Sequence, residues 1–194
     1  SFRIYPDGNN IIYVKKDNAG SDMTGSSWNN AINDLQLALN FAADDDNHPK
    51  VWIAKGTYTG NGWPYVDAFI GLNGIDIYGG FAGDEAHDYD LSQRDLVSNA
   101  TILDGQNIQR TLHQAHNTHF KYSLDPMHYA IYDGLVIRNG FVYRNFGGNV
   151  LMRKGELRNS VIENGAAIVG ASVGIFDTNS GGAGICATSK DVTV

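Results

Sequence analysis

Hydrophobic positions follow two different periods along the chain. Residues 11–14 form one short apolar run that predicts a strand. From Trp28 onward, apolar residues recur on a single helical face, at Ala31, Ile32, Leu35, Ala38, Leu39 and Ala42. Ser27 stands at the N-cap position, where its hydroxyl can accept a hydrogen bond from an unpaired backbone N–H. The pattern therefore predicts a strand and then a helix that begins at Trp28 and ends before Pro49.

After residue 48 the pattern changes to short apolar runs separated by glycine-containing turns. Five segments share the form Ile-x-x-Gly, and they begin at Ile53, Ile77, Ile102, Ile137 and Ile162. Their isoleucines are 24, 25, 35 and 25 residues apart, and the long interval contains a polar, histidine-rich stretch over residues 113–128 that is typical of an insertion. A repeat of this length without a helix in every unit, and without the leucine-rich signature, indicates a β-solenoid.

We therefore expect an all-β fold, a right-handed parallel β-helix with rungs of ~25 residues and an N-terminal capping α-helix. Residues 1–47 would form the first strand and the cap, and residues 48–194 the rungs, together one domain. The recurring isoleucines would stack in the core. Asn139 and Asn164 would lie above one another and bond through their amides. The sequence stops within an apparent strand, which suggests a longer protein or self-association through an open C-terminal rung.

Composition and charge narrow the possible partners. Glycine accounts for 23 of the 194 residues, a larger share than the ~7% of average proteins, as expected for many tight turns. The formal charge of −7 argues against nucleic-acid binding and against docking on anionic membranes. No apolar run approaches the ~20 residues of a membrane span, so no membrane insertion is expected. The single Cys186 excludes an internal disulfide.

Several segments resemble the pectin-lyase-like parallel β-helices of secreted and surface-displayed bacterial proteins. They cover residues 12–14 with 27–31, residues 51–58, residues 77–83 with 91–95 and 101–105, and residues 133–140. The resemblance implies a secreted or cell-surface location. It is compatible with a non-catalytic stalk, adhesin or carbohydrate-binding module, and also with a polysaccharide lyase or hydrolase whose active rungs lie mostly outside residues 1–194. These motifs describe core, cap and turns, so they predict no catalytic residue.

The resemblance also suggests a place for calcium, because lyases of this fold hold Ca²⁺ with carboxylates. The candidate ligands are Asp84, Glu85, Asp88 and Asp90, in one loop. Their spacing is irregular, and a solvated acidic loop without any cofactor is the favoured interpretation. Arg94 and Asp95 follow closely, and we expect them to fix this loop through an ion pair.

A second possible metal site contains histidines at three-residue intervals, His113, His116 and His119, with Asp125 and His128 nearby. Imidazole and carboxylate groups are suitable zinc ligands. In a strand, however, residues i and i+3 point to opposite faces. The spacing does not assemble a site by itself, and a polar loop is favoured.

Aromatic residues give the strongest indication of a ligand. Tyr58, Trp63 and Tyr65 lie in the loop over residues 57–65. Flat rings with a polar group suit the faces of sugars, so a polysaccharide or glycan is a candidate partner. The favoured interpretation is that these rings pack over the first rung and seal the edge of the core.

Overall fold

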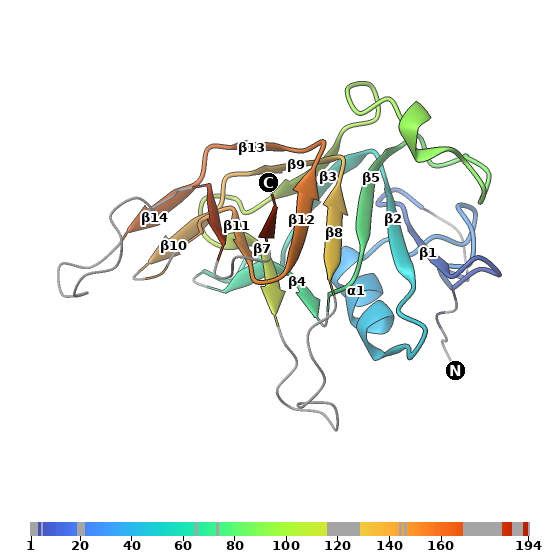
Figure 1. The fold of residues 1–194 in the computed structure, drawn as a ribbon, viewed down its shortest axis with the longest axis horizontal. Coiled ribbons are helices and arrows are strands. Elements are labelled where there is room, and N and C mark those ends of the chain that lie inside the picture. Colours follow the sequence, from blue (N-terminus) through green and yellow to red (C-terminus); the bar gives the residue numbers. More distant parts are fainter. Residues whose placement is uncertain are drawn as a thin grey trace.

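The computed structural model describes residues 4, 6–18, 22–64, 66–72, 74–115, 129–143, 145, 147–168, 184–187 and 192–193. In this part the chain consists mostly of short strands in parallel sheets, with one α-helix (Figure 1). The elements are β1 (Ile11–Val14), α1 (Leu35–Asp44), β2 (Lys50–Ala54), β3 (Gly56–Thr59), β4 (Asp67–Leu72), β5 (Ile77–Phe81), the 3-10 helix η1 (Leu91–Gln93), β6 (Thr101–Asp104), β7 (Arg110–Ala115), β8 (Ala130–Asp133), β9 (Leu135–Arg138), β10 (Phe141–Tyr143), β11 (Val150–Met152), β12 (Gly155–Arg158), β13 (Val161–Glu163), β14 (Ala166–Ile168), β15 (Ile185–Ala187) and β16 (Val192–Thr193).

The strands are arranged in three main sheets and one small sheet. Sheet A has the order β1-β2-β5-β8-β12-β16, sheet B has β13-β9-β6-β3, sheet C has β15-β11-β7-β4, and sheet D pairs β10 with β14. From β2 onward the chain contributes a strand to A, then to B, then to C, and returns to A. This round is repeated through β5 to β7 and again from β8, with β10 and β14 as additional strands. An all-β fold with parallel pairing is therefore confirmed.

The helix begins later than the sequence pattern predicts. Asp34, and not Ser27, is the N-cap, and its carboxylate accepts a hydrogen bond from the backbone N–H of Leu37 at 3.0 Å. The preceding segment forms a turn over residues 27–30 and then a bridge to β1, in which Ile32 N–H donates to Tyr13 O at 2.9 Å. Trp28, Ala31 and Ile32 are buried in this arrangement, which explains why their spacing imitates a helical face.

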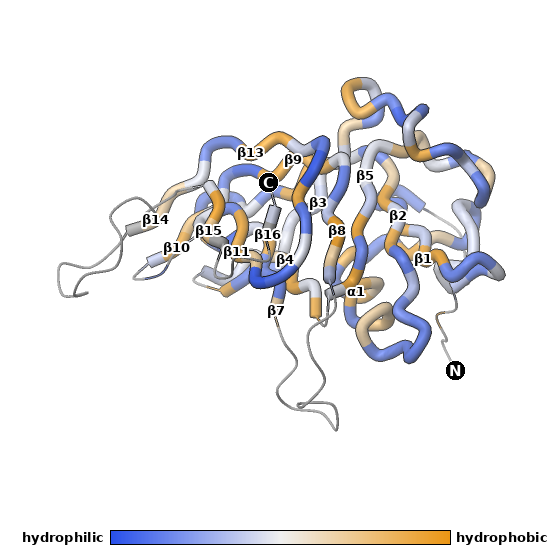
Figure 2. The backbone as a smooth tube through the Cα atoms, viewed as in Figure 1, coloured by the Kyte–Doolittle hydropathy of each residue, from blue (hydrophilic) through white to orange (hydrophobic). Residues whose placement is uncertain are grey.

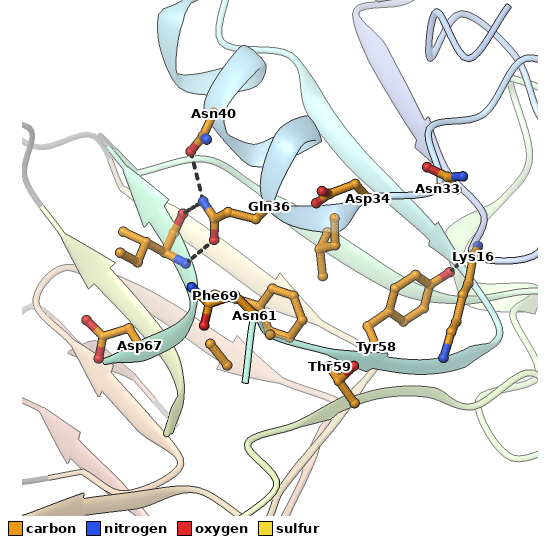
Figure 3. Close-up of a pocket in the computed structure, with 14 residues that line it drawn as sticks. Lys16, Asn33, Asp34, Gln36, Asn40, Tyr58, Thr59, Asn61, Asp67 and Phe69 are labelled. Atoms are coloured by element: carbon orange, nitrogen blue, oxygen red, sulfur yellow. Dashed lines mark hydrogen bonds between the residues drawn. The ribbon is translucent and has the colours of Figure 1, made fainter. Parts of the chain in front are cut away.

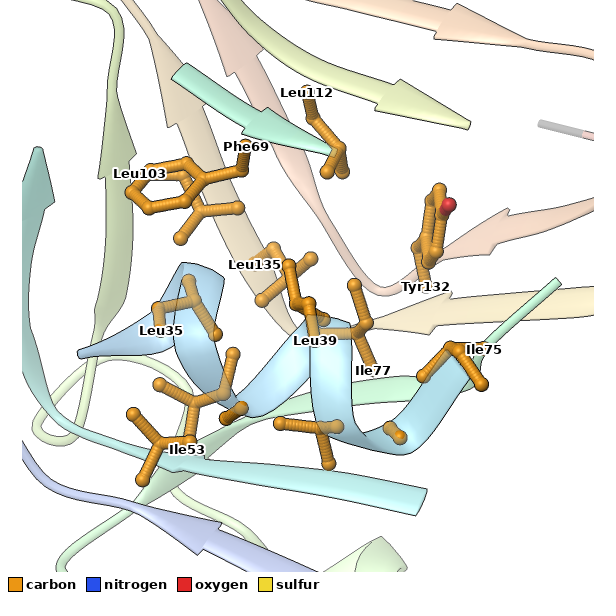
Figure 4. Close-up of a cluster of buried hydrophobic side chains, with 14 of the residues drawn as sticks. Leu35, Leu39, Ile53, Phe69, Ile75, Ile77, Leu103, Leu112, Tyr132 and Leu135 are labelled. Carbon is orange, nitrogen blue, oxygen red and sulfur yellow. The ribbon is translucent and has the colours of Figure 1, made fainter. Parts of the chain in front are cut away.

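The main core lies between the three sheets and α1. Sheet A contributes Ile53, Ile77 and Tyr132, sheet B contributes Leu103 and Leu135, sheet C contributes Phe69 and Leu112, and α1 contributes Leu35 and Leu39, all of them buried (Figure 4). The strands β1, β2 and β8 carry much of the hydrophobic sequence, whereas many of the connections are hydrophilic (Figure 2). Removing these side chains from water is the main stabilising contribution.

The predicted isoleucine ladder is only partly correct. Ile137 and Ile162 are register partners in sheet B, as expected. Ile53 and Ile77 belong to sheet A, however, and Ile102 pairs with Val136 rather than with Ile137. An interval of 25 residues separates register partners between β8 and β12, where residue 130 pairs with 155, and between β9 and β13, where 136 pairs with 161. Other rounds are longer, since residue 56 pairs with 101 across the loop that precedes β6.

Two similar polar clusters join successive rounds, and we call each an Asp–Arg–Asn clasp. In the first, the Asp104 carboxylate accepts hydrogen bonds from Arg138 Nε at 2.9 Å and from Asn139 Nδ2 at 3.0 Å. In the second, Asp133 accepts from Arg158 Nε at 2.8 Å and from Asn159 Nδ2 at 3.0 Å. Both asparagines have a positive φ, which this side chain tolerates better than most. The Asn139 amide thus bonds to a carboxylate of the preceding round, rather than forming the predicted bond with Asn164.

Candidate functional site

A polar groove of about 710 Å³ lies between the start of α1 and the strands β3 and β4 (Figure 3). Its walls come from four segments that are distant in the sequence. The lining residues are Lys16, Asn33, Asp34, Leu35, Gln36, Asn40, Tyr58, Thr59, Gly60, Asn61, Asp67, Ala68, Phe69 and Ile70. Most of these side chains are amides, carboxylates or hydroxyls. The groove therefore offers many hydrogen-bonding groups together with an apolar surface of similar extent.

The position of the groove follows from the sheet order. β3 and β4 are the edge strands of sheets B and C, so their outer backbone groups have no neighbouring strand. Gln36 of α1 occupies part of this edge: Ile70 N–H donates to Gln36 Oε1 at 2.7 Å, and Gln36 Nε2 donates to Ile70 O at 3.1 Å (Figure 3). The side-chain amide thus replaces one residue of a missing strand and holds α1 at a fixed distance from β4.

The charged groups of the groove are already engaged with the protein. Lys16 donates from Nζ to the backbone oxygen of Thr57 at 2.6 Å, along the edge of β3. Asp34 accepts through Oδ1 from the first turn of α1. Gln36 also donates to Asn40 Oδ1 at 2.8 Å, so the amide nitrogen of Asn40 takes no part in this hydrogen bond. The exposed amide and carboxylate groups of this wall belong to Asn33, Asp34 and Asn40.

Asp67 connects the groove with a polar cluster on β7. Its carboxylate forms an ion pair with Arg110 and accepts a hydrogen bond from His113 Nδ1 at 2.7 Å. Burial by itself raises the pKa of Asp67, but the His113 hydrogen bond and the Arg110 charge outweigh it and lower the pKa below its ordinary value. Asp67 is therefore ionised near neutral pH. The Nε2 atom of His113 is buried and has no hydrogen-bond partner among the residues that the structure describes.

The three predicted aromatic ligands have different surroundings. Trp63 is 69% exposed, on the loop that continues from the groove wall, and its backbone N–H donates to Asn61 Oδ1 at 3.0 Å. Tyr58 is only 3% exposed and its hydroxyl donates to Ala54 O at 2.9 Å, so its ring supports the groove wall and cannot stack on a sugar. Tyr65 lies outside the described residues. Tyr58 therefore packs within the protein, in agreement with the packing interpretation of this residue and not with a role in stacking on a sugar.

The acidic loop after β5 does not gather its carboxylates. Glu85 turns back to its own loop and accepts hydrogen bonds from the backbone N–H groups of residues 82–84. Asp90 caps η1 by accepting from Ser92 N–H at 2.9 Å. Asp84 and Asp88 are exposed. Over the part of the chain that the structure describes, no three His, Cys, Asp or Glu residues are grouped so that they could hold a metal ion.

Arg94 has a different partner from the one expected. It forms a buried ion pair with Asp133 at 2.9 Å and donates to the backbone oxygens of Gly79 and Leu91, both at 2.8 Å. Asp95 instead accepts hydrogen bonds from the backbone N–H groups of Val97 and Ser98. The loop is therefore fixed to β8 of the next round, and the local ion pair is not formed.

Of the histidine-rich segment, His113 lies in β7 and is held by Asp67. His116, His119, Asp125 and His128 lie outside the described residues. The prediction of an insertion over residues 113–128 therefore starts too early, because β7 continues to Ala115.

Sequence reasoning missed most of the groove. The sequence pattern singles out none of Asn33, Gln36, Asn40 and Asp67. No local motif identifies these residues, since the groove combines segments that run from residue 16 to residue 70. The aromatic loop over residues 57–65 is the one sequence signal that adjoins the groove, which it lines through residues 58–61.

Comparison with protein-family models, with curated proteins and with solved structures finds no match to this chain. Within the described residues, α1 falls short of the length and apolarity that a membrane-spanning helix requires.

Proposed function

We propose that the chain is a right-handed parallel β-helix of the pectin-lyase-like type, capped at its N-terminal side by α1. The proposal is supported by the repeated A–B–C order of the strands and by the parallel pairing of every sheet. A right-handed crossover is the general rule for parallel strands that are joined in one sheet. The two Asp–Arg–Asn clasps are consistent with this architecture, because each joins corresponding corners of successive rounds.

We further propose that this module is secreted or surface-displayed and binds carbohydrate without cleaving it. The observation that carries the proposal is the polar groove beside an exposed tryptophan. Side-chain amides and carboxylates can bond to sugar hydroxyls, while a flat ring covers the apolar face of a sugar. Trp63 is 69% exposed, so its ring is accessible to a ligand.

The state of Asp67 argues against one catalytic mechanism, a hydrolase in which Asp67 is the general acid. Glycoside hydrolases pair a carboxylate with a second carboxyl group whose raised pKa keeps it protonated as a general acid. The pKa of Asp67 is instead lowered, so it cannot serve as that acid at neutral pH. His113 Nε2, which could act as a base, is buried away from solvent.

The test is binding of the purified protein to a broad glycan array, with and without Ca²⁺. We expect specific binding that is independent of Ca²⁺ and that falls at least tenfold in Trp63→Ala. Tyr143→Ala is the matched control, because this aromatic residue is also exposed but lies on β10, far along the chain. The control should bind like the original protein.

Other outcomes discriminate between the remaining functions. A folded protein that binds no glycan would contradict the carbohydrate proposal and favour a stalk. Release of new reducing ends from a bound glycan would establish an enzyme. A molecular mass that rises with protein concentration would favour self-association.

A further inference from the structure

We infer that the groove selects neutral glycans and discriminates against uronic-acid and sulfated ones. The inference rests on the proposed carbohydrate function and adds the chemical class of the ligand. It follows from the charges that line the groove, from the engagement of each cation with the protein, and from the predominance of amide groups.

The groove carries more negative than positive side chains. Among the lining residues Lys16 is the only cation, against the two carboxylates of Asp34 and Asp67. One donor of the Lys16 ammonium group is already bonded to the Thr57 backbone oxygen at 2.6 Å. Recognition of carboxylates and sulfates in proteins relies on accessible Arg or Lys donors.

The guanidinium group of Arg110 is paired with Asp67, and Asp67 lines the groove whereas Arg110 does not. Arg110 is buried, donates from Nε to the backbone oxygen of Gly147 at 3.1 Å and pairs with Asp67. The Asp67 carboxylate therefore stands between Arg110 and a ligand in the groove. Because the pKa of Asp67 is lowered, this carboxylate keeps its negative charge at neutral pH. An anionic sugar in the groove would meet Asp34 and Asp67 first.

The remaining groups match uncharged hydroxyls. Asn33 and Asn40 are exposed on one wall, and Asn61 and Thr59 lie on the opposite wall. An amide donates and accepts, as a hydroxyl does, and a carboxylate accepts from two neighbouring hydroxyls. Because several walls carry such groups, a sugar can satisfy its hydroxyls on more than one side (Figure 3). Trp63 lies on the rim loop, where its ring can cover the apolar face of a sugar.

The test uses pairs of oligosaccharides with the same length and linkage that differ only at C6, which is a hydroxymethyl group in the neutral member and a carboxylate in the acidic member, in a galactose and a glucose series. Binding is measured by titration calorimetry at neutral pH and moderate salt. We expect at least one neutral member to bind ten times more tightly than its acidic counterpart. Equal or tighter binding of the acidic member in every pair that binds would overturn the inference and leave the carbohydrate function standing. Absence of binding to all members would overturn both.

Two variants place the selectivity in the groove. Asp34→Asn keeps the N-cap, because asparagine caps helices as well as aspartate does, and should narrow the preference for the neutral member several-fold. Asn33→Lys adds a cation at an exposed position and should increase acidic binding by a similar factor. Val97→Lys is the matched control, since Val97 is exposed outside the groove. If the control shifts selectivity as much as Asn33→Lys does, the inference is wrong.

Discussion

Replacing Asp133 by alanine should destabilise the protein more than the same replacement of Asp104, the carboxylate of the first clasp. Asp133 accepts hydrogen bonds from Arg94 at 2.9 Å, from Arg158 at 2.8 Å and from Asn159 at 3.0 Å. The side chain of Arg94 is 4% exposed, whereas that of Arg158 is 39% exposed. The decisive loss is therefore that of the Arg94 pair.

The expected loss of stability depends on the contacts that Arg94 and Arg158 keep when the Asp133 carboxylate is removed. Breaking a buried ion pair by removing one partner costs about 3–5 kcal/mol. Arg94 keeps the backbone oxygens of Gly79 and Leu91 and lies 5.6 Å from the centroid of the Phe81 ring, which places the cost near the lower end of that range. The exposed Arg158 contributes no more than about 1 kcal/mol. We expect Asp133→Ala to lower the free energy of unfolding by roughly 3–4 kcal/mol.

Asp104→Ala is the matched comparison. Asp104 has the same Arg and Asn partners in the first clasp, but Arg138 is 32% exposed and no buried guanidinium is left behind. Its loss should cost about 1–2 kcal/mol. Both variants are measured by urea denaturation, with the midpoint and slope fitted separately. An equal cost for the two substitutions would refute the argument that the buried Arg94 makes the difference.

Three further outcomes are expected. Burial raises the pKa of Asp133, but its Asn and Arg partners outweigh that effect and lower the pKa. The ionised Asp133 carboxylate therefore stabilises the fold fully above the unfolded pKa of about 3.9, and this stabilisation is lost as the pH falls through the lower folded value. The free energy of unfolding, measured from pH 7 to pH 2, should depend less on pH in Asp133→Asn. Gln36→Ala removes both bonds to the Ile70 backbone and should lower the free energy of unfolding by about 1–2 kcal/mol. The exposed edge of β4 should promote self-association, seen in size-exclusion chromatography, whereas Asn40→Ala should leave the protein monodisperse. Equal elution of both variants would contradict this role of Gln36. Tyr58→Phe should cost about 1 kcal/mol in urea denaturation and leave glycan affinity unchanged, and a tenfold loss of affinity would show that Tyr58 contacts the ligand.

Sequence periodicity predicted the class of the fold because strand length and turn chemistry are local properties. It could not predict the register. Ile53 and Ile102 begin the same kind of motif but lie in different sheets, since one round contains more than one strand-to-turn transition. The start of α1 was misplaced for a related reason, because Ile32 is buried by pairing with β1 and a buried extended residue has the same apolarity as a helical one.

The candidate site was less predictable than the fold. The exposed Trp63 could be singled out because a tryptophan beside glycine and proline residues is unusual in a buried strand. Gln36 and Asp67 gave no comparable signal, because their roles depend on Ile70 and His113, which are brought to them only by the folded chain. Contacts between residues that are tens of positions apart have no local spacing from which they could be predicted.

The amide of Gln36 makes the two edges of sheet C different from one another. By occupying the outer edge of β4 with a side chain, α1 provides the hydrogen bonds of a neighbouring strand without offering a further backbone edge. Further strands of sheet C are then added only on the opposite side of β4, in the order β7, β11 and β15. A polymer that is blocked at one end and open at the other grows from a defined origin. The helix and the first round are thus suited to act as a template on which later rounds are added in chain order.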